Sequence, residues 1–297
     1  MTLRSMAAIV TGSTSGIGLG IARKLAAAGA DILLNGLGDA GEIEKTRTGI
    51  EKEFGVRVFH HGADMRRPEQ IQAMVQGAEK TFGKVDILVN NAGIQHTARV
   101  ENFSMERWDD VIAINLSAAF HASKFVLPGM QKRSFGRIIN IASVHGLVAS
   151  KEKAAYVAAK HGIIGLTKVI ALENATNGVT CNAICPGWVL TPLVQKQIDD
   201  RAKAGGISVE DASIQLLSEK QPAQQFVTVE QIGDSSSTSW AVCAAAARAK
   251  VASQVSLRSG AARHSHLPAR SRPSSPGRLI TSSVTPSAAR LSRSGAR

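Results

Sequence analysis

Met6-Ala-Ala-Ile-Val-Thr-Gly-Ser-Thr-Ser-Gly-Ile-Gly18 decides the fold, because it places a glycine-rich turn between a short apolar run and a helical segment. Glycines let the backbone turn tightly and approach a phosphate closely. A helix N-terminus adds free N–H groups and the positive end of its dipole. A glycine pattern alone is weak evidence, but here it stands in the strand–turn–helix context that phosphate binding requires. A purely structural turn is the alternative.

Apolar strands alternate with helical segments through the first 233 residues. The predicted strands are Met6–Val10, Asp31–Asn35, Val56–His60, Ile87–Asn90, Arg137–Ile141 and Val179–Cys185. The predicted helices are Ile17–Ala28, Ala40–Phe54, Pro68–Phe82, Ser104–Met130 and Ala154–Thr176. Nearly continuous apolar strands fit a parallel sheet buried on both faces, and the alternation implies right-handed crossovers. We therefore predict an α/β fold with a doubly wound parallel sheet.

Composition and charge divide the chain into two parts. Its 297 residues are 44% apolar and 20% charged, which suffices for a folded core. The net charge of +12 is uneven, because residues 234–297 hold ten of the 35 basic residues and one of the 23 acidic ones. We expect a folded domain over 1–233 and a disordered Ser/Ala/Arg-rich tail over 234–297. A short helix over Ala241–Val251 is possible within that tail.

The same observations exclude several classes of protein. The tail lacks interleaved aromatic residues, so we expect no specific nucleic-acid partner, only salt-dependent contact. Three cysteines without metal-pair spacing predict neither a disulfide scaffold nor a metal site. No signal-peptide pattern and no uninterrupted apolar span is evident, so we expect a cytoplasmic protein without a membrane segment.

The candidate catalytic residues begin with Tyr156, the single tyrosine of the chain. Lys160 lies four residues later in a helical pattern, so both side chains share one face. A phenol is a poor base at neutral pH, but a nearby ammonium favours the phenolate and lowers the phenol pKa. Ser143, at the end of a predicted strand, can bind a reacting oxygen. Asn115 stands in an apolar helical stretch, where an amide needs a partner.

Two further motifs, Asn90-Asn-Ala-Gly93 and Tyr156-x-x-x-Lys160, accompany the Gly-x-x-x-Gly-x-Gly turn. In this combination the sequence from about Met6 to Gly233 resembles the short-chain dehydrogenase/reductase family. The resemblance implies a Rossmann-type sheet, a nicotinamide cofactor, and hydride transfer at a carbonyl or alcohol carbon. It makes Tyr156 the acid/base and Lys160 the ligand of the nicotinamide ribose. Ser143 orients the substrate oxygen, and Asn115 holds a water of the proton relay.

The resemblance also implies a set of cofactor contacts. They are Thr11, Gly12, Ser13, Ser15, Gly16, Ile17, Gly18, Leu37, Asp64, Met65, Asn91, Ala92, Gly93, Tyr156, Lys160, Pro186, Gly187, Val189 and Thr191. NADP needs a cation near its 2′-phosphate, and neither the glycine turn nor residues 35–41 contain Arg or Lys. NAD is therefore favoured. Asn35 occupies the strand end where an acid is expected to bind the ribose 2′-hydroxyl.

Longer stretches match a narrower group, the bacterial D-3-hydroxybutyrate dehydrogenases. They are Asn91–Ala98, Ala142–Ser150, Cys185–Val189 and Leu217–Pro222. In this group the substrate carboxylate is bound by four polar side chains, beside Ser143 and Tyr156, and Trp188 closes the pocket. The four are Gln95, His145, Lys153 and Gln197. A cation and hydrogen-bond donors are the chemistry that a carboxylate needs.

The reaction implied is (R)-3-hydroxybutyrate + NAD⁺ to acetoacetate + NADH + H⁺, under a mobile helical lid over residues 192–221. A short-chain reductase for 3-oxoacyl thioesters or sugars is the first alternative, and an inactive, altered fragment is the second.

The family pattern ends at Gln231-Ile-Gly233. Family members continue through a helix to a last strand ending in Asp-Gly-Gly-Trp, whereas this chain continues as Asp234-Ser-Ser-Ser-Thr-Ser-Trp240. We hypothesise a reading-frame shift that removes the seventh strand and leaves the sixth as an exposed edge. Relatives form tetramers through the missing part, so the assembly of this chain is in doubt.

Overall fold

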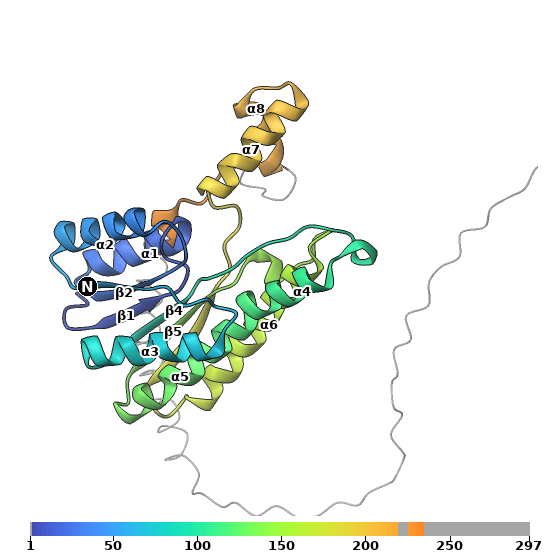
Figure 1. Cartoon of the computed structure of the whole chain (residues 1–297). Helices are drawn as coiled ribbons and strands as arrows, with labels where there is room; N and C mark the ends of the chain where they lie inside the picture. Colours follow the sequence, from blue (N-terminus) through green and yellow to red (C-terminus); the bar gives the residue numbers. More distant parts are fainter. Residues whose placement is uncertain (1, 219–224, 235–297) are drawn as a thin grey trace, which may run out of the picture. The chain divides into compact units, whose positions relative to one another are not determined.

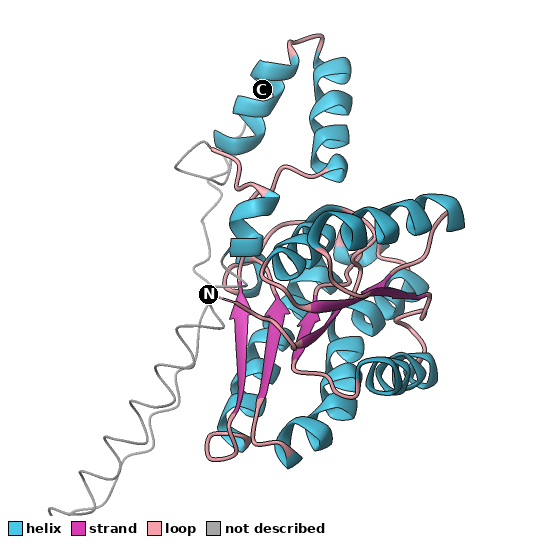
Figure 2. Ribbon diagram, turned by 90° about the vertical axis from the view of Figure 1, so that its left-hand side faces the viewer, coloured by secondary structure: helices cyan, strands magenta, loops and turns pink. Residues whose placement is uncertain are grey.

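The computed structural model describes residues 2–218 and 225–234. The strands in these residues are β1 (Ala7–Val10), β2 (Asp31–Asn35), β3 (Val58–His61), β4 (Ile87–Asn90), β5 (Gly136–Ile141) and β6 (Val179–Ile184). They form one sheet in the order β3-β2-β1-β4-β5-β6, and all neighbours are parallel. Figures 1 and 2 show this sheet between its helices. The predicted doubly wound α/β sheet is confirmed.

The direction in which strands are added reverses at β1. β1 pairs with β2 on one side and with β4 on the other, so that Ile9 aligns with Leu33 and with Leu88. Doubly wound sheets bind ligands in the crevice at such a reversal, beyond the carboxyl ends of the strands. The glycine-rich turn, residues 11–18, leaves β1 at this place.

Two helical layers cover the sheet (Figure 1). The helices that flank it are α1 (Gly16–Ala27), α2 (Ala40–Phe54), α3 (Pro68–Phe82), α4 (Met105–Ile112), α5 (Ala118–Lys132) and α6 (Ala154–Glu173). Neighbouring strand residues point to opposite faces. Val10 therefore packs in one core cluster with Leu25 of α1, whereas Ile9 packs in the other with Met74 of α3 and Met130 of α5.

The helix predicted over Ser104–Met130 is confirmed as one helical run, Met105–Lys132, with a π-helical segment inside it. It is divided into α4 and α5 by a π-helical segment, Ala113–Ser117. The side chain of Asn115 in this segment bonds to the backbone of Ile94 instead of lying in a regular helical layer. π-Helical turns often mark functional positions. The sequence did not indicate the π-helical segment, because apolar periodicity does not register a single extra residue in a turn.

Several elements begin or end at other residues than predicted. β3 begins at Val58 and not at Val56, since the Arg57 N–H donates to the side chain of Asp31 at 2.9 Å. β6 ends at Ile184 and α6 at Glu173, each before its predicted end. Two 3₁₀ turns, Val100–Asn102 and Val144–Gly146, join the main elements.

Residues after β6 form a helical hairpin, α7 (Pro192–Gly205) and α8 (Val209–Ser218). The two helices share a small apolar cluster that includes Ile198 and Leu216, with Trp188 and Phe226 against it. The Val227 N–H donates to the Trp188 carbonyl at 2.8 Å, which ties the returning chain to the loop that leads from β6 into the hairpin. The segment predicted as a lid is thus helical as far as Ser218, and residues 219–221 lie outside the described ones.

The described chain ends in a helical turn over residues 229–234. Ile232 joins the core cluster of α1, and Asp234 pairs with Lys24 at 2.9 Å. The predicted seventh-strand loss, the possible helix 241–251 and the tail itself lie outside the described residues. The boundary between 233 and 234 stays a prediction. Within the described part, β6 pairs with β5 alone.

Two helical runs are long and apolar enough to cross a membrane by length and composition, Met105–Lys132 and Ala154–Glu173. Both flank the sheet in this fold, where Val126, Met130 and Ile170 fill the core. Packing against the sheet accounts for part of their composition, while Phe120, Val169 and Leu172 on the same helices are exposed.

Candidate active site

Chemically active side chains gather beyond the carboxyl ends of the central strands. Thr11 follows β1, Asn91 follows β4, and Ser143 lies two residues after β5. Tyr156 and Lys160 lie one turn apart on α6. The parallel sheet thus brings four distant parts of the sequence to one edge.

The glycine-rich turn is tied to the end of β4. The Thr11 hydroxyl accepts the N–H groups of Asn91 at 2.9 Å and of Ala92 at 3.0 Å. In return, the Asn91 side-chain amide donates to the carbonyls of Thr11 and Gly12 at 2.9 and 3.0 Å. The turn needs a left-handed backbone at Gly12 (φ 61°), which favours glycine. These contacts fix the turn before any ligand binds.

Close packing explains two further positions of the turn. A Cβ at Gly18 would overlap the carbonyl of Gly12, so only glycine lets α1 approach the turn. The Ser13 hydroxyl is buried and bonds to the Val10 carbonyl at 2.6 Å. Its side chain therefore supports the turn from inside and does not face a ligand.

The start of α1 fits a pyrophosphate. The side chain of its N-cap, Ser15, makes no capping hydrogen bond, and the first turn holds no acidic residue. By contrast, Asp39 caps α2 by accepting the Glu42 N–H, and Glu42 adds a second acid there. A Cβ at Gly16 would meet nothing nearer than Thr191 at 3.9 Å. Open space, free backbone donors and a positive dipole end are what a dinucleotide phosphate needs.

Asn35 is a structural residue, not a ribose ligand. It is fully buried, its side-chain oxygen accepts the Gly12 N–H at 3.2 Å, and its amide donates to the carbonyls of His61 and Ala63 at 3.0 Å. All of its hydrogen-bonding groups face protein. The residue at the strand end where an acid is expected thus bonds to the protein itself, and its side chain makes no contact available to a ribose.

The far side of the crevice carries the residues predicted near the adenine. Asp64 follows β3, and its carboxylate is fixed by the backbone and guanidinium of Arg66. Those hydrogen bonds hold the pKa of Asp64 below its usual range. Leu37 at the end of β2 is 64% exposed, whereas Met65 is buried.

Tyr156 and Ser143 meet at the opposite side. The phenol is partly exposed and hydrogen-bonded to the Ser143 hydroxyl. Burial raises the pKa of Tyr156 above its ordinary value of 10.0, and the Ser143 contact works in the opposite direction. The expectation of a lowered phenol pKa is thus not met by these residues alone, because the cost of burying the phenolate outweighs the Ser143 hydrogen bond.

Lys160 is buried beneath Tyr156. Its ammonium donates to the Ile141 carbonyl at 2.7 Å and lies 5.6 Å from the centre of the Tyr156 ring. Burial lowers the pKa of Lys160 to about 8, against a smaller opposing effect of Cys185. The lysine is therefore a cation that can give up its proton within the working range of pH.

The buried side-chain amide of Asn115 has its hydrogen-bond partners on the backbone. Its side-chain oxygen accepts the Ile94 N–H at 2.8 Å, and its amide donates to the Ile94 carbonyl at 2.9 Å. A cavity of about 10 Å³ lies between Asn115, Lys160 and Thr11. That volume is about what one water molecule requires. The geometry brings Asn115 and Lys160 to a shared, water-sized space.

The predicted substrate residues are only partly assembled. The Lys153 ammonium lies 5.7 Å from the centre of the Trp188 ring, and the His145 ring meets that of Tyr156 edge-on at 6.1 Å. In the described part of the chain, Gln95 and Gln197 are exposed. His145 thus contacts the phenol, and Lys153 and Trp188 contact each other.

The loop after β6 completes the crevice. The Pro186 carbonyl accepts the Val144 N–H at 2.9 Å, which joins this loop to the Ser143 turn. Val189 is buried and bridges to Val227, and Thr191 caps α7 by accepting the Val194 N–H at 3.4 Å. Gly187 is exposed, as are Gly93 and Gln95 on the facing loop.

The family model for short chain dehydrogenases matches residues 6–202. The chain belongs to this family. Its relatives include the D-beta-hydroxybutyrate dehydrogenase of Cupriavidus necator, 59% identical over 233 residues, which are 78% of this chain and 89% of the relative. The protein of the same name from Rhizobium meliloti is 54% identical over 76% of this chain and 87% of its own length.

Solved structures agree on the fold of this short-chain dehydrogenase. The L-sorbose reductase of Gluconobacter frateurii, complexed with NADPH and L-sorbose, has a TM-score of 0.75 at 29% identity, over 79% of this chain and 89% of that one. A single-substitution variant of the actinorhodin polyketide ketoreductase with NADPH has a TM-score of 0.72 at 36% identity, over 79% and 90%. Family and neighbours together show a nicotinamide dinucleotide as the cofactor of this dehydrogenase fold.

Residues missed from the sequence are mostly backbone groups. The Ile94 peptide holds Asn115, and the Ile141 carbonyl holds the ammonium of Lys160. The sequence does not show which backbone group a side chain will bind. The available signals were the side chains of Asn115 and Lys160, which need hydrogen-bond partners when they are buried. Arg66 was missed as well, although it follows a predicted site residue by two positions.

Proposed function

We propose that this dehydrogenase oxidises (R)-3-hydroxybutyrate to acetoacetate with NAD⁺. The observation that carries the proposal is the pair of relatives, 59% and 54% identical over most of the chain, that are named D-beta-hydroxybutyrate dehydrogenase. The described residues support it, since a phenol, a hydroxyl and a buried ammonium lie together at the carboxyl edge of the sheet.

Tyr156 takes the proton of the substrate hydroxyl while Ser143 holds the oxygen. The Ser143–Tyr156 contact supports this assignment, because two groups so close together can reach one substrate oxygen. As the O–H bond breaks, the electron pair forms the carbonyl and the C3 hydrogen leaves as hydride. When bound, the nicotinamide accepts that hydride. Removing the proton at the same site lowers the barrier, as positioned general bases do.

Lys160 restores Tyr156 for the next cycle. The lysine is buried one helical turn from the phenol, and its lowered pKa of about 8 lets it pass a proton onward. The water-sized cavity shared with Asn115 gives that proton a route away from the phenol. The π segment matters here because it turns Asn115 toward Ile94 and the cavity.

The carboxylate of the substrate is bound by Lys153 and His145, with Gln95 and Gln197 added as the α7–α8 hairpin closes. Lys153 is held beside Trp188, and His145 beside Tyr156. A cation with hydrogen-bond donors near the phenol fits a short hydroxy acid, whose carboxylate lies two carbons from the alcohol. This polarity disfavours the neutral chain of an acyl thioester.

NAD is preferred over NADP. The segment after β2 presents Leu37 and the carboxylate of Asp39, and it contains no cation. Gly36 cannot gain a side chain, because its Cβ would lie 2.5 Å from the Thr14 hydroxyl. A 2′-phosphate at this place would meet an acid and no partner, which costs affinity.

The test follows NADH formation by absorbance with the full chain, NAD⁺ and (R)-3-hydroxybutyrate, with Tyr156→Phe as the control. The proposal predicts turnover of the (R) acid, little with the (S) acid, and kcat/KM for NAD⁺ at least about tenfold above that for NADP⁺. The solved neighbours carry NADPH, so faster turnover of a 3-hydroxyacyl-CoA with NADP⁺ would favour the ketoacyl or sugar reductases instead. Absence of all turnover would support an inactive chain.

A further inference from the structure

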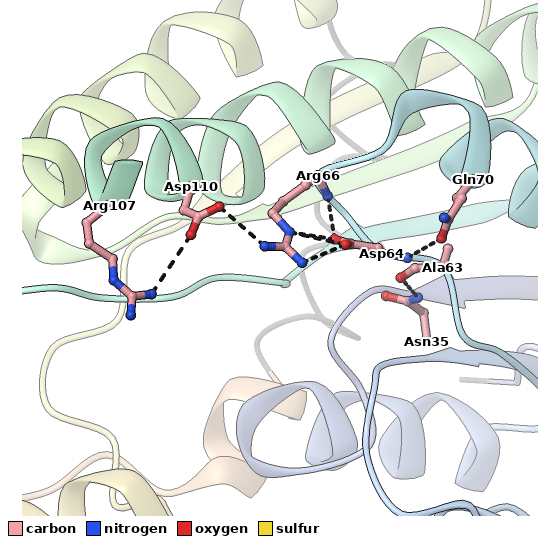
Figure 3. Close-up of polar contacts among 7 residues, drawn as sticks. All are labelled: Asn35, Ala63, Asp64, Arg66, Gln70, Arg107 and Asp110. Carbon is pink, nitrogen blue, oxygen red and sulfur yellow. Dashed lines mark hydrogen bonds and ion pairs between the residues drawn. The ribbon is translucent and has the colours of Figure 1, made fainter. Parts of the chain in front are cut away.

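Arg66 has no role in the reaction just described, yet it makes the densest set of polar contacts at the crevice. Its backbone N–H and guanidinium donate four hydrogen bonds to Asp64, at 2.8 to 3.1 Å. The same guanidinium reaches Asp110 of α4 at 3.5 Å, and Arg107 lies 3.9 Å from the other oxygen of Asp110. Figure 3 shows the four side chains as a row of alternating charge, leading from α4 to Asp64.

Hydrogen bonds fix both the backbone and the side chain of Asp64, yet its carboxylate stays accessible. Its N–H donates to the Gln70 side chain at 2.8 Å, and the carbonyl before it, on Ala63, accepts from Asn35 at 3.0 Å. The Asp64 side chain keeps 20% of its exposed area. A carboxylate has about four acceptor positions, so one that is fixed and ionised can still accept a hydrogen bond. Figure 3 shows these contacts meeting at the end of β3.

Position in the fold indicates what such a carboxylate would meet. A dinucleotide lies across the reversal in strand order with its pyrophosphate at the glycine-rich turn. The reacting half lies with Tyr156 and Ser143 near β5, so the other nucleotide lies over β2 and β3. Asp64 follows β3, and the exposed Leu37 follows β2. An ionised carboxylate accepts hydrogen bonds only, which suits the exocyclic amine of adenine and not an oxo group.

We propose that Arg66 is a positioning residue, anchored to Asp110, that orients the Asp64 carboxylate for recognition of the cofactor's adenine amine. The inference rests on the proposed use of an adenine dinucleotide. Arg66 contributes no contact to the ligand. It fixes one rotamer and one charge state of Asp64, and Asp110 on α4 gives the half-exposed guanidinium a second partner. A rigid acceptor discriminates between bases better than a mobile one.

The chain offers a matched control at the other end of the sheet. Arg57 binds Asp31 with the same pattern, a backbone N–H at 2.9 Å and a guanidinium at 2.6 Å, and the exposures of the two pairs are close. This pair joins the beginnings of β2 and β3, away from the crevice. Both variants thus lose an arginine–aspartate pair, and Arg57→Ala also loses contacts with Thr81 and Phe82, which makes it a demanding control for lost stability.

The experiment measures dissociation constants with the full chain, without turnover. NADH binding is followed by its fluorescence, and AMP and IMP compete with it. These two nucleotides differ at position 6 of the base, an amine against an oxo group. Wild type is expected to bind AMP about tenfold more tightly than IMP, and Arg66→Ala to reduce that ratio to about twofold. Asp110→Asn is expected to reduce it less, and Arg57→Ala to leave it unchanged.

Separate outcomes test the inference and the function. If Arg66→Ala and Arg66→Lys both kept the wild-type ratio of AMP to IMP affinity, the positioning role would be overturned. An equal fall in Arg57→Ala would overturn it too, since the effect would then come from lost stability. Should Arg66→Ala fail to fold, Asp110→Asn and Arg66→Lys carry the same test. Failure of NADH to bind wild type would overturn the proposed function, and the inference with it.

Discussion

The two ends of the sheet use the same kinds of polar residue for different purposes. At the amino end, Asp86 is buried and accepts hydrogen bonds from the Ala7 N–H at 3.1 Å and from Lys84 at 3.0 Å. At the carboxyl end, Tyr156 and Lys160 are enclosed with few charged partners. The charge of Asp86 at the amino end is paired, whereas Tyr156 and Lys160 at the carboxyl end have pKa values displaced by burial. Perturbed titration is typical of active sites, and pairing is typical of structure.

The largest effect is expected from a substitution at the carboxyl end of the sheet, where activity should be lost and stability kept. Tyr156→Phe removes the group proposed to take the substrate proton, so kcat should fall about 10³-fold or more, in the range of lost general acid–base catalysis. The midpoint of thermal unfolding should stay near wild type, because the ring and its packing remain. Steady-state kinetics and a thermal melt on the same preparation check both. Activity within tenfold of wild type would remove Tyr156 from the mechanism.

The complementary substitution is at the amino end of the sheet, where stability should be lost and activity kept. Asp86→Ala leaves the Ala7 N–H and the ammonium of Lys84 without their acceptor, and the free energy of unfolding should fall by about 3 kcal/mol. Turnover per folded molecule should not change, because the substitution is remote from the crevice. Urea unfolding gives the free energy of unfolding. The steady-state rate, divided by the concentration of active sites from an NADH titration, gives the turnover per folded molecule. A stable variant with lost turnover would contradict the division between the two ends.

A smaller effect is expected from two glycine substitutions, one in the glycine-rich turn and one on α2, away from the site. Gly18→Ala forces a methyl group toward the Gly12 carbonyl, so NADH should bind at least about tenfold more weakly. Gly49→Ala is its control on α2, where a Cβ meets nothing within 4 Å. That substitution should raise the free energy of unfolding by about 0.5–1 kcal/mol and leave binding unchanged. Fluorescence titration and chemical unfolding distinguish them, and equal NADH affinity in both variants would argue against the turn as a phosphate site.

The smallest effect is in the dependence on pH. Oxidation requires the phenolate of Tyr156, whose pKa burial raises, together with the ammonium of Lys160, whose pKa is about 8. The phenolate fraction rises with pH, and the ammonium fraction falls above pH 8. The kcat/KM for oxidation should therefore increase by at most about tenfold per pH unit and reach its maximum above pH 8. A maximum at or below neutral pH would show that the two groups do not act in these states.

Much of the fold follows from the sequence because its elements are locally marked. Apolar runs of four to six residues separated by helical periodicity predict the six strands, and the glycine-rich turn predicts the crevice. The π segment was not predictable in this way, since it depends on how Asn115 meets the backbone of Ile94. The role of Asn35 was not predictable for a related reason. Its residue type does not reveal its partners, and only the structure shows that its side chain bonds to His61 and Gly12.

Residue identities at the site were predictable, while their charge states were not. Tyr156-x-x-x-Lys160 places the two groups one helical turn apart from spacing alone. The depth of burial, which displaces both pKa values, depends on the closing of loops from β4, β5 and β6. Arg66 illustrates the same limit, because its partner Asp110 is distant in sequence and reaches it through the packing of α4.

The central claim is that the carboxyl end of the sheet transfers hydride from a hydroxy acid to a nicotinamide. The most direct measurement uses (R)-3-hydroxybutyrate deuterated at C3, with NAD⁺ and the full chain in ordinary water. The account predicts one deuterium from C3 on the nicotinamide ring of the product, detected by mass or NMR, and none in Tyr156→Phe. NADH formed without that deuterium, or with hydrogen from the solvent, would contradict direct transfer at this site.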